Sequence, residues 1–144
     1  MRLISVYDIP EADAVLYELL AERPRENFIS HERLPTFREH QAFIASHPFM
    51  LWLLIESDGV YLGAIEVTDR NEIGIAILRR YQGKGCGKEA LSLFLDSYSP
   101  LPAIPAIRNG RWLVNVAPSN MQAQSFFLGF GFKTIQLTMA LPNG

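Results

Sequence analysis

Three glycines in the segment QGKGCG, at positions 82–87, lie between a strand-like run and a helix-like run. The run at 72–78 is apolar and predicts a strand, and the run after the glycines has one apolar face. That face carries Ala90, Leu91, Phe94 and Leu95. Backbone N–H groups at the start of a helix lack intrahelical partners, and the helix dipole is positive there. The chain is therefore predicted to form a strand–loop–helix unit that can hold an anion such as a phosphate.

The composition of this loop suits an anionic ligand. Gly83, Gly85 and Gly87 have no β-carbon that would block the close approach of a phosphate. Lys84 and Lys88 add positive charge. A glycine-rich turn without any ligand remains the alternative for the loop taken alone.

Three phosphate-binding patterns can be compared with the loop. A Walker A loop needs glycine at position 82 and Ser or Thr at position 89, and neither position holds such a residue. A dinucleotide-binding fingerprint needs a third glycine at position 88, which is a lysine. The spacing that fits is Gln/Arg-x-x-Gly-x-Gly/Ala, filled by Gln82, Gly85 and Gly87.

The rest of the chain predicts an alternation of strands and helices without a domain break or an internal repeat. Apolar runs predict strands at 3–7, 49–56, 60–67, 72–78, 112–116 and 132–141. Capping-box spacings predict that three of the helices begin after Asp8, Thr36 and Ser119. The last of these helices is expected to end at Gly129 in a left-handed conformation. The segments 26–34 and 98–111 have no period and are interpreted as loops.

Composition excludes several classes of protein. The 144 residues include 13 basic and 15 acidic side chains, so there is no basic field to hold a nucleic acid. The single cysteine allows neither a disulfide framework nor a thiolate zinc site, and no metal is expected. The longest apolar stretch, at 49–55, is far shorter than the roughly 20 residues that span a bilayer. We therefore expect one cytoplasmic domain over 1–144, without membrane or nucleic-acid partners, as a monomer or homodimer.

With these elements in place, the chain resembles the GNAT superfamily of acyl-CoA-dependent N-acyltransferases. Its glycine spacing matches the pyrophosphate motif of that family, and Asn120 and Ala123 match its Asn-x-x-Ala/Ser helix start. Gly131 and Phe132 match its Gly-Phe ending. The resemblance implies an α/β (α+β) fold with a mixed, mostly antiparallel central sheet of about six or seven strands. The sheet would splay between its fourth and fifth strands, and about four helices would flank it.

The resemblance also implies that acetyl-CoA is the acyl donor. The fourth strand would pair with the pantetheine arm, the glycine loop would bind the pyrophosphate, and the last helix would line the distal arm. The residues expected to contact acetyl-CoA are Ile75, Ile77, Leu78, Gln82, Gly83, Lys84, Gly85, Cys86, Gly87, Lys88, Asn115, Asn120, Ala123, Phe126 and Phe127.

The main departure from the family pattern is Phe127, which stands where the family often has a tyrosine that protonates the leaving thiolate. For the base, Glu72 at the start of the fourth strand is the expected catalytic residue, and Glu66 on the third strand is a weaker candidate. A solvated carboxylate at a strand end is the structural alternative for Glu72.

The expected function is transfer of an acetyl group to a primary amine of a small molecule, with an amino sugar among the options. The alternatives are a protein acetyltransferase that acts on an N-terminus or a lysine, and an acyl-CoA-binding module without catalysis. The loop at 23–34 is expected to cover the acceptor side, where Arg25 and Arg33 favour an acidic acceptor. Because the catalytic machinery is sparse, the amine is expected to have a low pKa.

Overall fold

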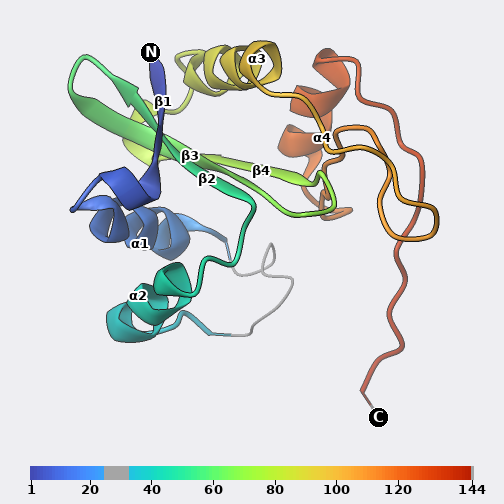
Figure 1. The fold of residues 1–144 in the computed structure, drawn as a ribbon, viewed down its shortest axis with the longest axis horizontal. Coiled ribbons are helices and arrows are strands. Elements are labelled where there is room, and N and C mark those ends of the chain that lie inside the picture. Colours follow the sequence, from blue (N-terminus) through green and yellow to red (C-terminus); the bar gives the residue numbers. More distant parts are fainter. Residues whose placement is uncertain (25–32, 144) are drawn as a thin grey trace.

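The computed structural model describes residues 1–24 and 33–143. Its central sheet is antiparallel, with neighbouring strands in sequence order (Figure 1). The strands are β1 (Arg2–Ser5), β2 (Leu51–Ser57), β3 (Val60–Val67) and β4 (Ile73–Ile77). Asp58 and Gly59 form the tight turn between β2 and β3, and both have positive φ. This turn sets the register that brings β3 residues opposite those of β2.

Helices lie on both faces of the sheet. They are η1 (Val6–Asp8), α1 (Ala12–Glu22), α2 (Phe37–Ala45), η3 (Arg79–Tyr81), α3 (Cys86–Ser97) and α4 (Met121–Gly129). Figure 1 shows α1 and α2 on one face, α3 on the other, and α4 beyond the β4 side of the sheet. In the described part of the chain, none of these helices has the length and apolar character that a membrane crossing requires.

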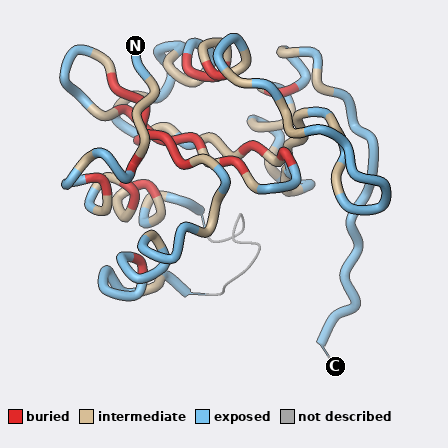
Figure 2. The backbone as a smooth tube through the Cα atoms, viewed as in Figure 1, coloured by how far each residue is buried: buried red, intermediate tan, exposed pale blue. Residues whose placement is uncertain are grey.

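Two apolar cores follow from the alternation of side chains along the strands. Ile55 and Ile65 pack with Phe94 of α3, whereas Leu54 and Ala64 pack on the face that α1 covers. The buried residues accordingly run along the middle of the sheet and the inner sides of α1 and α3 (Figure 2). Because β2 is covered on both faces, its sequence is a continuous apolar run rather than an alternating one.

One of the three predicted capping boxes is confirmed. The Glu39 amide donates to Thr36 Oγ1 at 3.1 Å, and the Thr36 amide donates to Glu39 Oε1 at 3.0 Å. The cap predicted at Asp8 is wrong, because Asp8 closes η1 and α1 begins at Ala12. Residue 9 precedes a proline and is extended, which separates the two helices.

The third cap is displaced by one residue from the prediction. Asn120, not Ser119, is the N-cap of α4, and its Oδ1 accepts from the Ala123 amide at 3.1 Å. The helix ends at Gly129 as predicted, but the left-handed residue that follows is Gly131, with φ +95°. Either polar side chain could have capped this helix, so spacing alone did not separate them.

The strands predicted at 112–116 and 132–141 do not form regular strands, so the described residues give a sheet of four strands rather than six or seven. At 112–116 only one parallel bridge remains, between Glu72 and Leu113. The described segment at 132–143 runs along the outside of the molecule (Figure 1), with Leu137 and Met139 exposed. A strand needs a neighbour for its N–H and C=O groups, and neither segment has one along its length.

Candidate active site

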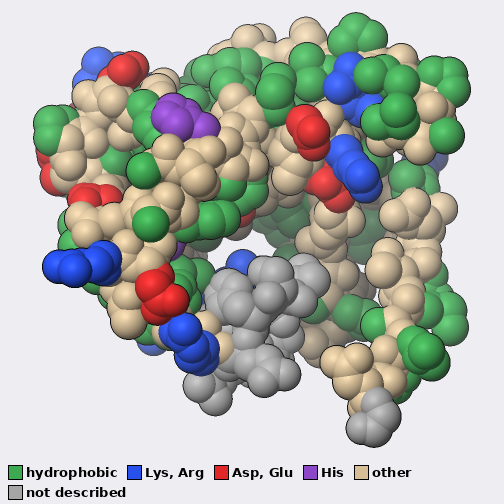
Figure 3. Space-filling view, turned by 60° about the horizontal axis from the view of Figure 1, so that its bottom comes forward, with side chains coloured by type: hydrophobic (Ala, Val, Ile, Leu, Met, Phe, Trp, Pro, Cys, Tyr) green, Lys and Arg blue, Asp and Glu red, His purple; other side chains and the backbone are tan. Residues whose placement is uncertain are grey.

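A cavity of about 1520 Å³ runs beside β4 and joins three parts of the molecule. It starts among side chains of α1 and α2, passes along β4 from Ile73 to Ile77, and ends at the glycine loop and α4. Figure 3 shows the molecule hollowed near the centre of the face drawn there. The cavity therefore connects the predicted phosphate loop with the side of the sheet on which α1 and α2 lie.

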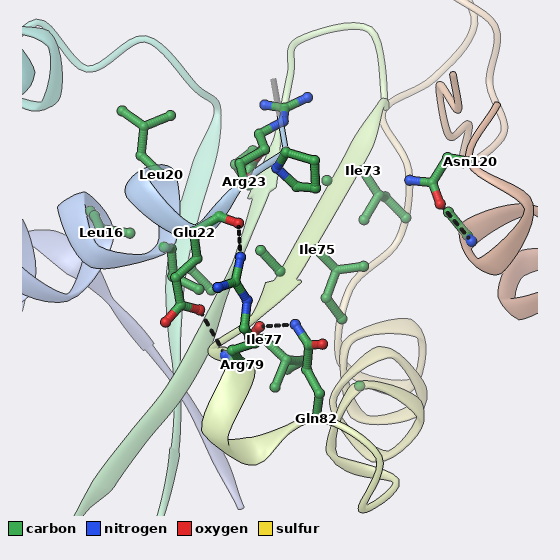
Figure 4. Close-up of a pocket in the computed structure, with 18 of the residues that line it drawn as sticks. Leu16, Leu20, Glu22, Arg23, Ile73, Ile75, Ile77, Arg79, Gln82 and Asn120 are labelled. Carbon is green, nitrogen blue, oxygen red and sulfur yellow. Dashed lines mark hydrogen bonds between the residues drawn. The ribbon is translucent and has the colours of Figure 1, made fainter. Parts of the chain in front are cut away.

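The free edge of β4 faces this cavity. The Ile73 amide donates to Leu113 O at 2.8 Å, whereas the Leu78 amide donates to Leu62 O on β3 at 2.9 Å. Because alternate amides of a strand point the same way, those of Ile75 and Ile77 point away from β3. Figure 4 shows Ile75 and Ile77 on the β4 ribbon beside the cavity. After residue 113 the neighbouring segment diverges, so these two amides are open to an extended ligand.

The glycine loop has the geometry that anion binding needs. Gly83 and Gly85 have φ of +76° and +80°, which is a left-handed conformation that favours glycine. Gly85 is the N-cap of α3, and the first backbone hydrogen bond of that helix is from the Glu89 amide to Gly85 O at 3.0 Å. The amides of residues 86–88 therefore precede the helical ladder and can donate to a phosphate.

Gln82 and Arg79 fasten this loop to its surroundings. Gln82 Nε2 donates to Ile77 O at 2.8 Å, which ties the loop to the end of β4 (Figure 4). The Arg79 amide donates to Glu22 Oε1 at 2.7 Å, and Arg79 Nη2 donates to Glu22 O at 2.9 Å. The link between Glu22 and Arg79 joins α1 to the end of β4, and the sequence contained no signal for it.

The α4 side of the cavity is apolar. Phe126 lies against the glycine loop, since a β-carbon at Gly87 would be 3.7 Å from its ring. Phe127 is only 8% exposed and packs edge-on against Phe132, with ring centroids 5.5 Å apart. A phenyl ring at position 127 has no proton to donate to a leaving group.

The structure brings most of the predicted donor-site residues together. The cavity is lined by Ile75, Ile77, Gln82, Gly83, Gly85, Cys86, Gly87, Lys88, Asn115, Asn120, Ala123, Phe126 and Phe127. Two others do not line it: Lys84 lies on the exposed part of the loop, and Leu78 is buried in the core on the α1 side. The roles of these residues toward acetyl-CoA stay predictions.

The two carboxylates considered as bases occupy different surroundings. Glu72 accepts from Thr68 Oγ1 at 2.9 Å and from Asn115 Nδ2 at 2.5 Å, and it lines a separate cavity of about 470 Å³. Glu66 lines the large cavity. Burial raises the pKa of the Glu66 carboxyl above its ordinary value, and the Arg23 guanidinium acts in the opposite direction. Glu72 as the base stays a prediction.

The predicted acceptor loop is described only at its ends. Arg23, Pro24 and Arg33 line the cavity, which agrees with a place on the acceptor side. Arg33 forms a two-bond salt bridge with Glu39, with both N–O distances 3.2 Å. Arg25 lies outside the described residues, so the prediction that the loop favours an acidic acceptor stays untested.

The residues present fit an elongated ligand that carries phosphates at one end and an amide-rich arm at the other. Left-handed glycines and free helical amides lie at one end of the cavity, and a strand edge with two open amides lies along its middle. A peptide-like arm can add to such an edge in the way a β-strand does.

Comparison with known proteins agrees with this geometry. The sequence model of the acetyltransferase (GNAT) family matches residues 14–132, and the chain therefore belongs to that family. Its members are enzymes that use acetyl-CoA as acyl donor. A search of curated proteins found no significant match.

Solved structures show the same fold. An acetyltransferase from Thermus thermophilus has a TM-score of 0.62 at 19% identity, over 94% of this chain and 88% of that one. The aminoglycoside N-acetyltransferase AAC(6')-Iy, in complex with CoA, has a TM-score of 0.62 at 13% identity, over 99% and 92%. A ribosomal-protein-alanine N-acetyltransferase from Brucella melitensis biovar Abortus 2308 has a TM-score of 0.63 at 12% identity, over 99% and 98%. The predicted fold class is confirmed.

Proposed function

We propose that the protein transfers an acetyl group from acetyl-CoA to a primary amine of a small molecule. One observation carries the proposal: a single cavity joins the glycine loop, the free edge of β4 and the space beside α1 and α2. A donor held along the first two parts would present its reactive end to the third. An acceptor that enters between α1, α2 and β4 would then meet it.

In this reaction acetyl-CoA supplies an activated acetyl thioester. The amine nitrogen forms a C–N bond to the carbonyl carbon, the C–S bond breaks, and CoA leaves as its thiolate, which then takes up a proton from solvent to become the thiol. The open amide of Ile75 or Ile77 can donate to the carbonyl oxygen, where negative charge develops. A carboxylate takes the proton that the amine loses, and Glu72 and Glu66 are the candidates.

The absence of a hydroxyl at Phe127 is compatible with turnover. A thiol of pKa near 8.5 costs about 2 kcal/mol at most to expel as thiolate at pH 7. This cost is small beside the barrier reduction of about 8 kcal/mol or more that enzymes commonly provide. We therefore expect the wild-type protein to be active without this hydroxyl. Phe127→Tyr should raise the rate only modestly, if the new hydroxyl reaches the sulfur.

The acceptor is expected to be an amine of low pKa. A lysine side chain, with a pKa of about 10.4, is neutral in roughly one molecule in a few thousand at pH 7, a deficit near 4–5 kcal/mol. A positioned base supplies typically about 10²–10⁴-fold, so lysine would use nearly all of it. An amine whose pKa is lowered by a neighbouring oxygen avoids most of this cost.

The test is release of CoA thiol from acetyl-CoA with three groups of acceptors: small amines, peptides with free N-termini, and lysine peptides blocked at the N-terminus. We expect the small amines to give the highest kcat/KM. A clear preference for either peptide group would show a protein acetyltransferase. Tight binding of acetyl-CoA without thiol release on any acceptor would instead indicate a binding module.

A further inference from the structure

A row of side chains crosses the face of the sheet that carries α1 and α2. Trp52 on β2 is the cross-strand partner of Glu66 on β3, and Glu66 is the partner of Gly74 on β4. His40 of α2 packs edge-on against Trp52, with ring centroids 6.4 Å apart. All four residues line the large cavity. The row therefore leads from α2 to the edge of β4.

Two members of this row carry buried nitrogens without partners. His40 and Trp52 are 6% and 7% exposed, and neither His40 Nε2 nor Trp52 Nε1 has a hydrogen-bond partner among the described residues. A buried polar group without a partner has lost its hydrogen bond to water and gained none in return. Such groups are uncommon in folded proteins, and here both belong to residues that line one cavity.

Glu66 extends over β4 because position 74 is a glycine. A β-carbon at Gly74 would lie 2.4 Å from Glu66 Oε1, which is closer than any real contact of this kind. Within residues 1–24 and 33–143, the Glu66 carboxylate forms no salt bridge and no hydrogen bond to another side chain, although the Arg23 guanidinium acts on it electrostatically. Gly74 precedes Ile75, whose amide is open to the donor side. Glu66 is thus a carboxylate placed next to the point where the donor arm is expected.

Aromatic side chains form part of the wall of the cavity that Glu66 lines, together with charged residues such as Arg23. Phe43, Phe49 and Trp52 form a cluster of edge-on rings with centroid distances of 4.9 to 6.0 Å, and all three line the cavity. Aromatic rings attract an ammonium group electrostatically and bury an apolar body well. They offer few hydrogen bonds to a sugar, whose many hydroxyls would lose their partners in water.

We propose that this row is the acceptor site: Glu66 pairs with the ammonium of the incoming amine, and the aromatic cluster binds an apolar or aromatic body. Trp52 Nε1–H then donates to an oxygen on that body, and the site selects a compact aryl-bearing amine over an amino sugar. This inference rests on the proposed function and narrows its substrate class.

The substrate part of the proposal is tested with three amines that share a hydroxyl beside the amine-bearing carbon: 2-amino-1-phenylethanol, ethanolamine and glucosamine. 2-Amino-1-phenylethanol has a phenyl ring that ethanolamine lacks. Glucosamine has sugar hydroxyls in place of that ring. We expect kcat/KM for the phenyl compound to exceed the other two by about tenfold or more. A preference for glucosamine would overturn the assignment of an apolar acceptor.

The residue part is tested with Glu66→Gln, Trp52→Phe and Gly74→Ala, with Asp96→Asn on the exposed side of α3 as the control. We expect Glu66→Gln to raise the KM for 2-amino-1-phenylethanol by roughly 10- to 100-fold, because a charge-assisted hydrogen bond is lost. Gly74→Ala should have a similar effect, since its β-carbon displaces the carboxylate. Trp52→Phe keeps a ring but removes the N–H, so a smaller increase in KM is expected.

Direct binding measurements separate this inference from the proposed function. Calorimetry gives the affinity of each variant for acetyl-CoA, and titration of 2-amino-1-phenylethanol into CoA-loaded protein gives the amine affinity without turnover. We expect acetyl-CoA affinity to stay at the wild-type value in all four variants. Wild-type amine affinity in Glu66→Gln would overturn the Glu66 assignment. Failure of the wild-type protein to bind acetyl-CoA would instead overturn the proposed function.

Discussion

Asn115 Nδ2 donates to Glu72 Oε2 at 2.5 Å, which joins the start of β4 to the segment that diverges from it. The other carboxylate oxygen of Glu72 accepts from Thr68 Oγ1 at 2.9 Å. The parallel bridge between Glu72 and Leu113 lies at the same place. Glu72 therefore lies where β4 and this segment are still joined, and its hydrogen bonds fix the position from which the two diverge.

Glu72→Gln is expected to weaken this junction. An amide keeps one oxygen acceptor, so one of the two donors facing residue 72 loses its partner. Loss of one such bond costs about 1 kcal/mol, which corresponds to a fall in Tm of roughly 2–4 °C for a domain of this size. Thermal denaturation followed by circular dichroism measures the change.

Asn115→Ala separates the structural role of Glu72 from a catalytic one. It breaks the same hydrogen bond but keeps the carboxylate, so it should lower Tm by a similar amount. If Glu72 is the base, Glu72→Gln abolishes the acidic limb of the pH–rate profile, where a base becomes protonated, and Asn115→Ala retains it. Equal, small losses of rate in both variants would leave Glu72 with the structural role alone.

Gly85→Ala is expected to weaken acetyl-CoA binding by about tenfold or more, because φ of +80° is unfavourable for alanine and the loop must shift. Gly59→Ala is the matched control: φ is +78° in the β2–β3 turn, and a β-carbon at either glycine meets no atom within 4 Å. Both variants should lose about 1 kcal/mol of stability. Only Gly85→Ala should change the affinity for acetyl-CoA measured by calorimetry. Equal acetyl-CoA affinities in the two variants would contradict the phosphate-loop assignment.

Asn71→Ala is expected to be among the most destabilising single changes outside the apolar cores. Asn71 is 1% exposed, donates to Leu101 O and Asn109 O at 3.0 and 2.7 Å, and accepts from the Leu101 amide at 2.8 Å. Three bonds at about 1 kcal/mol each give a loss near 3 kcal/mol, or roughly 6–12 °C in Tm. Urea unfolding checks the value.

A second substitution at this position isolates the backbone contribution. Asn71 has φ of +64°, which alanine tolerates poorly and glycine accepts. Asn71→Gly should therefore be less destabilising than Asn71→Ala, although it loses the same three bonds. If the two variants are equally stable, the left-handed conformation costs nothing measurable there.

The sequence predicted those parts of the fold that local patterns determine. The strand at 60–67 and the Thr36–Glu39 capping box are as expected, because alternation and capping act over a few neighbouring residues. The strands expected at 112–116 and 132–141 have suitable apolar content but lack neighbours along their length. Pairing depends on what lies alongside a strand in space, and a single run of residues does not contain that information.

In the candidate site, too, the sequence predicts the part that depends on local residues and misses the part that depends on strand pairing. The glycine loop could be predicted because its conformation is set by the residues within it, and Gly83 and Gly85 do have positive φ. The row from His40 through Trp52 and Glu66 to Gly74 could not be predicted, because it depends on the register of three strands. The one local signal was Gly74 inside an apolar strand, a position where glycine often marks a close approach.

The last prediction concerns His40 and pH. Burial lowers the pKa of this imidazole below its ordinary value, and Asp13 acts in the opposite direction. The unfolded chain therefore binds a proton on His40 more readily than the folded chain does, so stability from this site is present above the unfolded pKa of about 6.5 and falls as pH drops below it. Urea unfolding between about pH 8 and pH 5 should show a stability loss that is smaller in His40→Gln than in the wild-type protein. His47→Gln, which changes an exposed histidine stacked on Tyr7 at 3.8 Å, is the control for the replacement of a histidine outside the core. An identical dependence in His40→Gln and the wild-type protein would show that His40 is not buried in its neutral form.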